Sequence, residues 1–270
     1  MPSGGTGTAG AASGQVRAGS EWLTLREPAD AAARSTELIA ELLRYLPARD
    51  LVVHDLGCGT GSMTRWLAPR LPRPAHWILH DRDAALLNRV EPEHQTRLDD
   101  VTRLAPQDLA DADLVTASAL LDMMTAAELE RFVDACSSIR CPVLITLSVV
   151  GRVELDPVDP LDTDFQDAFN DHQRRETTGG RLLGPDAFRA AVTAFTARGR
   201  NVVVRPSPWR LDTDHPELLA EWLTGWLAAA TEQRPGLATR DYARRRLAEA
   251  ARASLTVTVH HEDLLVRPSA

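Results

Sequence analysis

Apolar and polar positions follow two different periods in the first half of the chain. Residues 51–56 and 142–148 are short apolar runs with β-branched side chains, which is typical of buried strands. Between such runs, stretches like residues 125–139 place apolar side chains at helical spacing. Strands and helices that alternate in this way predict a parallel sheet with helices on both faces. We therefore expect a doubly wound α/β core over residues 51–150.

The pattern also predicts what precedes this core. Residues 1–20 are rich in glycine, serine and alanine and lack the charged and apolar parts of a signal peptide, so we expect a flexible tail. Residues 28–46 read as one helix, with Pro28 in its first turn and an apolar stripe along one side. A chain of this length fits a single elaborated domain over residues 21–270.

Two insertions are expected after the core. Residues 151–184 are acidic and punctuated by proline, with an amphipathic run inside, and we predict an active-site lid. Residues 213–253 separate two strand candidates, 201–205 and 254–260, and we predict two helices there. The first of these helices carries two tryptophans that we interpret as core anchors, Trp222 and Trp226. Such an apolar insertion suits either a pocket or a homodimer surface.

The first strand of the core ends in an unusual turn. Residues 51–61 read LVVHDLGCGTG, so three alternating glycines follow the apolar run, and a helical pattern starts at Ser62. Glycine accepts positive φ and lets a backbone approach a ligand closely, which indicates a nucleotide site. A dinucleotide fingerprint needs glycine or alanine as its third small residue, but the two registers have Ser62 and Thr64 there. This disfavours a nicotinamide-dependent oxidoreductase.

The segment DLGCGTG, residues 55–61, resembles motif I of the class I S-adenosylmethionine-dependent methyltransferases. The resemblance covers residues 51–150 well, and beyond them it extends only to the order of the strands. It implies a Rossmann-like sheet of seven strands, the last antiparallel, on which the helical insertions would form a cap. It also implies that S-adenosyl-L-methionine is the cofactor.

Further segments follow in the order that this family has. Asp81 ends the second strand and would accept hydrogen bonds from the ribose hydroxyls, and Asp83 beyond it is interpreted as a helix cap. Asp100 and Val101 follow the third strand and would contact the adenine. Arg34 would bind the cofactor's carboxylate by a two-pronged bond. Cys58 is interpreted as a packing residue. The cofactor-binding residues that the resemblance implies are Arg34, Asp55, Gly57, Cys58, Gly59, Gly61, Asp81, Arg82, Asp100, Val101 and Ser118. For Asp55, capping of the glycine turn is an alternative role.

A catalytic base is needed only if the acceptor loses a proton as it is methylated. Two candidates are Asp122, which follows the fourth strand, and His172 in the predicted lid. Asp122 could instead cap the helix that begins near Thr125, and His172 could be a surface residue. His54 is interpreted as a hydrogen-bonded core residue. His260 and His261 are neighbours on a strand and face opposite sides, so we expect no metal site there.

Composition narrows the substrate. All 30 basic residues are arginine, which excludes Schiff-base chemistry and a catalytic lysine. The formal net charge of −8 makes a nucleic-acid partner unexpected, and the cluster 244–246 is interpreted as a solvated helix face. The three cysteines form no disulfide framework and no run of about 18 apolar residues is present, so we expect a cytoplasmic protein without a membrane span.

These observations predict a methyltransferase that acts on a small organic molecule at oxygen or carbon. Methylation of nitrogen, on a small molecule or on RNA, is an alternative. A protein that binds S-adenosylmethionine without catalysis is another.

Overall fold

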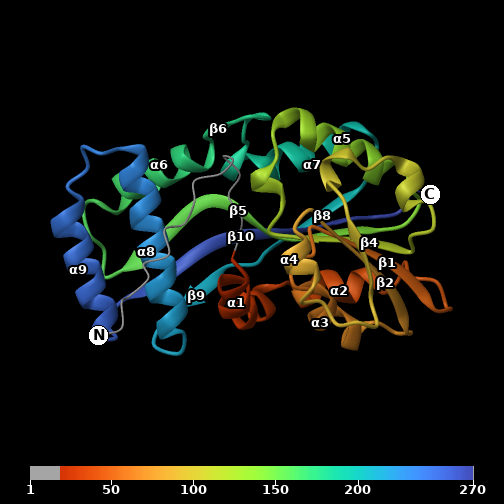
Figure 1. Cartoon of the computed structure of the whole chain (residues 1–270), viewed down its shortest axis with the longest axis horizontal. Helices are drawn as coiled ribbons and strands as arrows, with labels where there is room; N and C mark the ends of the chain where they lie inside the picture. Colours follow the sequence, from red (N-terminus) through yellow and green to blue (C-terminus); the bar gives the residue numbers. More distant parts are fainter. Residues whose placement is uncertain (1–18, 270) are drawn as a thin grey trace, which may run out of the picture.

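The computed structural model describes residues 19–269, and a mixed β-sheet runs through its centre (Figure 1). Seven strands follow one another in the order β3-β2-β1-β4-β5-β10-β8, and the short strand β9 pairs with β10 as well. β1 is parallel to β2 and β4, whereas β10 is antiparallel to β5 and β8. The predicted Rossmann-like fold with an antiparallel last strand is therefore confirmed. The strands are β1 (Leu51–Leu56), β2 (Ala75–Asp81), β3 (Gln95–Leu98), β4 (Leu114–Ser118), β5 (Val143–Asp156), β8 (Val202–Pro206), β9 (Trp209–Leu211) and β10 (Thr256–Val266), and a separate hairpin is formed by β6 (Glu176–Thr177) and β7 (Gly180–Arg181).

Helices cover both faces of the sheet because successive strand residues point to opposite sides. In β5, for example, Val143 and Ile145 pack against α5 and α7, whereas Leu144 packs in the core formed with α2 and α3. The helices are α1 (Ser20–Ala33), α2 (Thr36–Leu42), α3 (Ser62–Leu67), α4 (Ala84–Leu87), α5 (Ala126–Ser137), α6 (Asp162–Gln173), α7 (Ala187–Ala197), α8 (Pro216–Gln233) and α9 (Thr239–Ala251). Short 3₁₀ turns are η1 (Ala68–Arg70), η2 (Val101–Arg103), η3 (Pro106–Leu109), η4 (Leu121–Met123) and η5 (Gly184–Asp186).

The segment before β1 differs from its prediction. Two helices, α1 and α2, replace the single helix expected over residues 28–46, and Pro28 lies inside α1. The chain turns at Arg34, and Ser35 caps α2 by accepting a hydrogen bond from the backbone N–H of Leu38. The Ser35 N–H is held at 2.8 Å by the buried carboxylate of Asp263 on β10. This contact across more than 200 residues is invisible in the local pattern. The predicted tail lies outside the described residues, apart from Gly19 and Ser20, which begin the structure.

The segment predicted as a lid, residues 151–184, begins inside the sheet and contributes α6 to the wall of the cavity described below. β5 continues through Asp156 and pairs with the first half of β10, so the start of this segment belongs to the sheet. The segment continues into α6, which packs on α8. The fifth strand was predicted over residues 142–148 only, and the two valines and Gly151 that follow do not show locally that it continues. The strand continues because β10 supplies the hydrogen-bonding partner.

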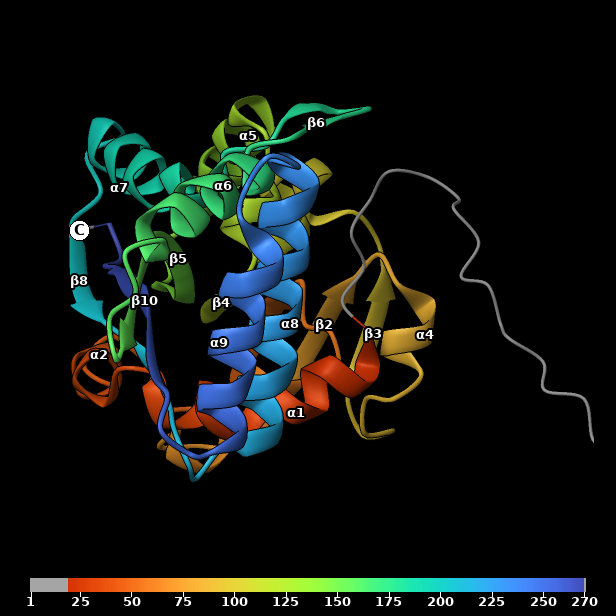
Figure 2. The same ribbon diagram turned by 90° about the vertical axis from the view of Figure 1, so that its left-hand side faces the viewer.

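Residues 213–253 contain α8 and α9, which lie side by side at one end of the molecule (Figure 2). Together with α6 they enclose a third apolar core, in which Phe165 stacks on Tyr242 with ring centroids 4.1 Å apart. Trp222 and Trp226 are both buried and stacked on each other, as the core-anchor interpretation requires.

Arg246 corrects the prediction that residues 244–246 form a solvated face. Its guanidinium is fully buried and donates to both carboxylate oxygens of Asp162 at 2.5 and 2.6 Å. It also donates to the carbonyl of Pro157 and to Glu249. Arg244 and Arg245 remain exposed, although Arg245 also pairs with Asp159 ahead of α6, so only one of the three arginines is buried. Within residues 19–269, no helix combines the length and the apolar character needed to cross a membrane.

Candidate functional site

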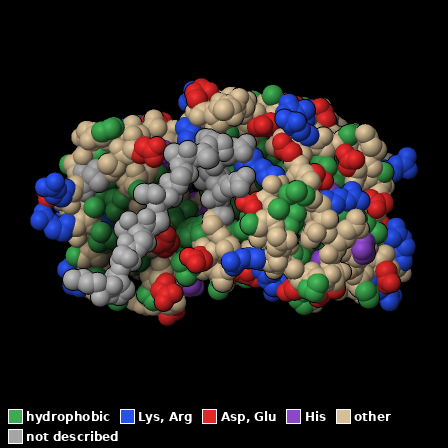
Figure 3. Space-filling model, viewed as in Figure 1, with side chains coloured by type: hydrophobic (Ala, Val, Ile, Leu, Met, Phe, Trp, Pro, Cys, Tyr) green, Lys and Arg blue, Asp and Glu red, His purple; other side chains and the backbone are tan. Residues whose placement is uncertain are grey.

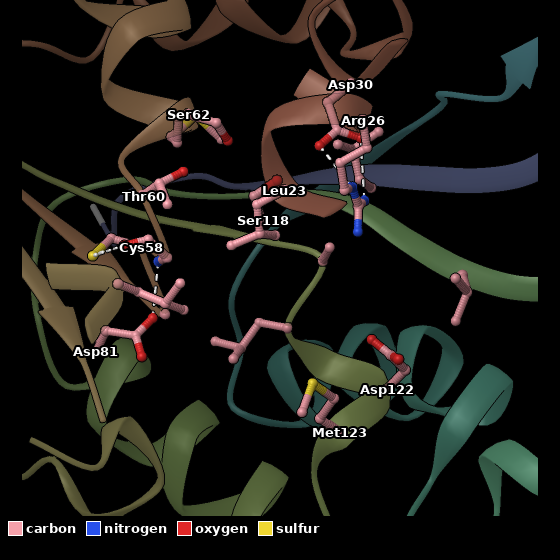
Figure 4. A pocket seen from close by; sticks show the side chains of 18 of the residues that line it. Leu23, Arg26, Asp30, Cys58, Thr60, Ser62, Asp81, Ser118, Asp122 and Met123 are labelled. Atoms are coloured by element: carbon pink, nitrogen blue, oxygen red, sulfur yellow. Dashed lines mark hydrogen bonds and ion pairs between the residues drawn. The ribbon is translucent and has the colours of Figure 1, made fainter. Parts of the chain in front are cut away.

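A cavity of about 460 Å³ opens where β1, β2 and β4 end, beneath α1 and beside α6 and α8. The carboxyl ends of parallel strands at the point where strand order reverses are the usual ligand site of such sheets. Figure 4 shows Cys58 and Asp81 on one side of this cavity, and Arg26, Asp30 and Asp122 on the other. We call the first side the glycine-loop end (residues 55–63, 81–86 and 99–102), and the second the aromatic end, which is lined by Trp22, Phe169, Trp209 and Trp222.

The glycine loop has the backbone geometry that its sequence predicts. Gly57, Gly59 and Gly61 have φ values of +70°, +56° and +84°. A Cβ at Gly57 would lie 2.8 Å from Leu120 Cδ1, and one at Gly59 would lie 3.1 Å from Leu23 Cδ1 on α1. Glycine is therefore favoured at Gly57 and Gly59 by the left-handed backbone conformation, and a Cβ at either position would also displace the end of a leucine side chain. Gly61 does not line the cavity, and its left-handed conformation instead starts α3.

Asp81 binds the glycine loop directly. Its Oδ2 accepts a hydrogen bond of 2.8 Å from the backbone N–H of Gly59, and its Oδ1 accepts one of 2.9 Å from the N–H of Asp83. Each carboxylate oxygen can accept a second bond, so Asp81 can still receive ribose hydroxyls. Asp83 accepts from the N–H of Ala85 and caps α4, as predicted.

The two aspartates that follow β3, Asp99 and Asp100, make different contacts. Asp100 caps η2 by accepting hydrogen bonds from the backbone N–H and the hydroxyl of Thr102. Asp99 accepts from Nδ1 of the buried His80, and His80 in turn contacts His54 at 2.9 Å. His54 is a buried, hydrogen-bonded core residue, as predicted. Asp99, Asp100 and the following Val101 all line the cavity.

Asp55 has one oxygen without a partner. Its Oδ1 accepts a hydrogen bond of 2.7 Å from the Thr116 hydroxyl, whereas its buried Oδ2 has no hydrogen-bond partner among the described residues. Burial raises the pKa of Asp55 to about 6, although the Thr116 hydroxyl and Arg34 oppose this shift. A buried carboxylate with an unpartnered oxygen can accept a hydrogen bond from a ligand or form an ion pair with a positively charged ligand group.

Arg34 lies behind the cavity wall. It is not among the cavity-lining residues that the structure describes, and its buried Nη2 donates to the hydroxyls of Ser62 and Ser118. Both serines do line the cavity. The Nε and Nη1 of Arg34 are buried and have no hydrogen-bond partner among the described residues, so the predicted contact of Arg34 with a cofactor carboxylate stays a prediction.

Arg26, on α1, is the arginine near Arg34 that lines the cavity. It forms a two-pronged pair with Asp30, at 3.0 and 3.1 Å, and its guanidinium lies 4.7 Å from the ring centroid of Trp209. Trp209 Nε1 donates to the same carboxylate at 2.9 Å. Spacing of four residues on a helix is a signal for such a pair, but β9, which carries Trp209, was not predicted.

The two predicted catalytic residues separate in the structure. Asp122 lines the cavity, and it does not cap α5, because Thr125 and Glu128 form a reciprocal cap there. Burial raises the pKa of Asp122 to about 6, against a backbone N–H and the charges of Arg26 and Arg175. His172 is absent from the described cavity wall, and its Nε2 lies 3.4 Å from Glu232 on α8. The geometry thus gives no support to His172 as a base.

Two further residues of the aromatic end, His261 and Gln173, were not predicted from the sequence to bind a ligand. His261 is 4% exposed, lines the cavity, and has no hydrogen-bond partner at Nδ1 among the described residues. Gln173 lines the cavity with a buried, unpartnered Oε1. Alternation along β10 places His261 in line with the buried Val257 and Val259, which was the available signal for His261.

All predicted cofactor-binding residues except Gly61 and Arg34 line this one cavity. The thiol of Cys58 is buried and burial raises its pKa, so it packs as a small apolar side chain, as interpreted. The only metal-type cluster in the described part of the chain is Glu91, Glu93 and His94, outside the cavity. The fold and this site define a nucleotide-cofactor-binding α/β protein.

Comparison with known proteins narrows this class. Residues 53–142 match a family model described as a methyltransferase domain. The fold is similar to that of a proposed type II methyltransferase from Anaeromyxobacter dehalogenans, with a TM-score of 0.50 and 16% identity over 86% of this chain and 95% of that chain. It is also similar to a proposed methyltransferase of an antibiotic biosynthesis pathway from Anabaena variabilis, with a TM-score of 0.50 and 13% identity over 88% and 99% of the two chains. No curated protein matches the sequence.

The match to the family model spans the strands and turns that build the glycine-loop end of the cavity. Over residues 53–142 the chain is therefore similar to a methyltransferase domain, and its fold is shared with solved methyltransferase structures.

Proposed function

We propose that this protein transfers the methyl group of S-adenosylmethionine to oxygen or carbon of a small organic acceptor. The observation that carries the proposal is the continuity of the cavity, which joins the glycine-loop end to a second, aromatic end that contains Asp122. A methyltransferase needs such a two-ended site, because donor and acceptor must be aligned for an in-line displacement.

The residues of the glycine-loop end fit this cofactor. Gly57 and Gly59 leave a space that a Cβ would fill, and Asp55 Oδ2 is a buried acceptor without a partner. The cofactor carries an ammonium and a sulfonium charge, which favour the ionised form of Asp55. Asp81 and Asp100 would hold the ribose and adenine parts. When bound, the cofactor supplies a methyl group activated by a sulfonium.

The chain's own residues then align the acceptor and remove its proton. Asp122 is the candidate proton acceptor, since a carboxyl group with a pKa of about 6 accepts a proton more readily than an ordinary aspartate. The side chains of Leu23 and Trp22 on α1 lie along the cavity and limit the access of water.

Charge favours a small acceptor over a nucleic acid. On the face drawn in Figure 3, acidic and basic side chains are interspersed rather than gathered in one basic patch. The chain has 38 acidic and 30 basic residues, and strong nucleic-acid binding relies on clustered cations. Four aromatic side chains line one end of the cavity, which suits an apolar molecule.

Titration calorimetry of the full chain with S-adenosylhomocysteine, and separately with NAD, tests the cofactor assignment. We expect micromolar binding of S-adenosylhomocysteine and at least a tenfold loss in Asp81→Ala, because hydrogen bonds to a charged group are worth about 1.5–3 kcal/mol. The matched control is Asp164→Ala, which removes an exposed carboxylate of α6 outside the cavity. Preference for NAD, or no binding of either compound, would refute the proposal. Binding of structured RNA at physiological salt would overturn the small-acceptor part.

A further inference from the structure

The aromatic end contains an unusual set of polar atoms. Three groups there can accept hydrogen bonds or protons: Asp122, Gln173 Oε1 and, in the tautomer that carries its proton on Nε2, His261 Nδ1. The two neutral ones, Gln173 and His261, have no partner at these atoms among the described residues, although both atoms are buried. Buried polar atoms are usually hydrogen-bonded, so a pair of unpartnered acceptors in one cavity points to a ligand that supplies donors.

Among the described residues, the arginine that lines this end is already paired. Arg26 is paired with Asp30 through two hydrogen bonds, and the Asp30 carboxylate is fixed further by Trp209 Nε1. An anionic acceptor would have to break this arrangement or lie near Asp122 with only Arg175, which is outside the described cavity wall, to compensate its charge. His261 does not supply a second cation, since burial and the nearby Arg26 lower its pKa to about 3 and keep the imidazole neutral.

The walls favour a flat molecule. Trp22, Trp209 and Trp222 come from α1, β9 and α8, and Phe169 lies one helical turn before Gln173 on α6. Trp209 is tilted by 55° against the His261 ring, with centroids 5.3 Å apart. Aromatic walls with polar atoms at a few points recognise the faces of a planar ligand and the position of its hydroxyl groups.

We infer that the acceptor is an uncharged, planar aromatic compound with hydroxyl groups, and that His261 and Gln173 are the residues that select it by accepting hydrogen bonds from those hydroxyls. This inference deepens the proposed function and rests on it. It assigns His261 and Gln173 to substrate specificity, while Asp122 keeps the role of proton acceptor.

Binding of matched probes tests the inference without turnover. The full chain is saturated with S-adenosylhomocysteine and titrated by calorimetry with 2,3-dihydroxynaphthalene, 2,3-dimethoxynaphthalene, 2-naphthoate and 2-(aminomethyl)naphthalene. We expect the dihydroxy compound to bind at least tenfold more tightly than each of the other three. In His261→Phe the preference for hydroxyl over methoxy groups should shrink at least fivefold, and Gln173→Met should reduce it in the same direction.

The ratio of the two affinities separates recognition from structural damage. A variant that merely distorts the cavity weakens both probes alike and leaves their ratio unchanged, and that result in both variants would overturn the assignment. The matched control is His260→Phe on the same strand, whose side chain lies 3.3 Å from Glu154 and outside the cavity, and which should keep the wild-type ratio.

The same titration also tests anionic and cationic acceptors as alternatives. Tighter binding of 2-naphthoate would show that Arg26 leaves Asp30 to hold an anion, and tighter binding of the amine would show that the aromatic walls and Asp122 hold a cation. Either result overturns the inference, as does equal binding of all four probes. If S-adenosylhomocysteine itself does not bind, the proposed function fails first, so the two failures are distinguishable.

Discussion

The two ends of the cavity are built in different ways. The glycine-loop end consists of three short turns that each follow a strand in the parallel part of the sheet, so near neighbours in sequence supply its contacts. The aromatic end draws on segments from Trp22 to His261, which come together only when α1, α6, α8, β9 and β10 pack. The first end can be recognised from local sequence, whereas the second is a product of tertiary packing. Changes at the first should alter cofactor binding, and changes at the second should spare it.

Substitution at the glycine loop should have the largest effect. Gly57→Ala places a Cβ 2.8 Å from Leu120 in a residue with φ of +70°, so we expect about 2–4 kcal/mol of destabilisation from strain and overlap. The affinity for S-adenosylhomocysteine should fall by roughly a hundredfold, which corresponds to about 3 kcal/mol of binding free energy. Urea unfolding and calorimetry measure the two effects. The control is Gly225→Ala in the exposed face of α8, where a Cβ meets nothing and we expect about 0.5–1 kcal/mol of stabilisation.

Breaking the ion pair of the aromatic end comes next. Asp30→Ala leaves Arg26 and Trp209 Nε1 without their shared acceptor, so we expect about 2–3 kcal/mol of destabilisation. If the two ends are independent, S-adenosylhomocysteine affinity stays within about twofold of wild type. A large loss of cofactor affinity in this stably folded variant would contradict the comparison.

Removal of the Asp122 charge should stabilise the protein. The pKa of Asp122 is about 6 in the folded chain and about 3.9 in an unfolded one, so ionisation above pH 6 costs folding free energy. Asp122→Asn should therefore gain about 1–3 kcal/mol at pH 8, and the gain should shrink between pH 6 and pH 4, where the native carboxyl group is protonated. Thermal unfolding against pH measures this, and Asp164→Asn, an exposed control, should change stability by less than about 0.5 kcal/mol. A pH-independent gain would contradict the assigned pKa.

The pH dependence of cofactor affinity is the smallest and most local test. Asp55 has a pKa of about 6 in the free protein, and a cationic cofactor favours its ionised form. Affinity for S-adenosylmethionine should therefore weaken as pH falls below about 6, approaching tenfold per pH unit. Calorimetry at pH 7.5 and pH 5 measures the change, and Asp55→Asn should bind more weakly and lose this dependence. The same slope in that variant would assign the titration to another group.

Prediction from sequence succeeded where a local pattern fixes the backbone. The glycine spacing gave the loop, the acids after β2 and β3 were placed at the cavity, and the capping role of Asp83 was confirmed. It failed at residues 28–46, where a distant carboxylate, Asp263, fixes the break between two helices. The placement of His172 beside Glu232 on α8 fits the alternative role of a residue outside the cavity, because helical periodicity could not say whether that face of α6 meets the cavity or α8.

The sequence by itself determined the strand–loop–helix units and the match to a methyltransferase domain, because both depend on residues close together in the chain, and its composition excludes lysine chemistry. Only the tertiary structure decided that Arg26 rather than Arg34 reaches the cavity, that Arg246 is buried, and that His261 faces the same space as Asp122. The physical reason is that burial and missing hydrogen-bond partners are properties of packed surfaces. They arise when distant segments exclude water together, and no single segment encodes them.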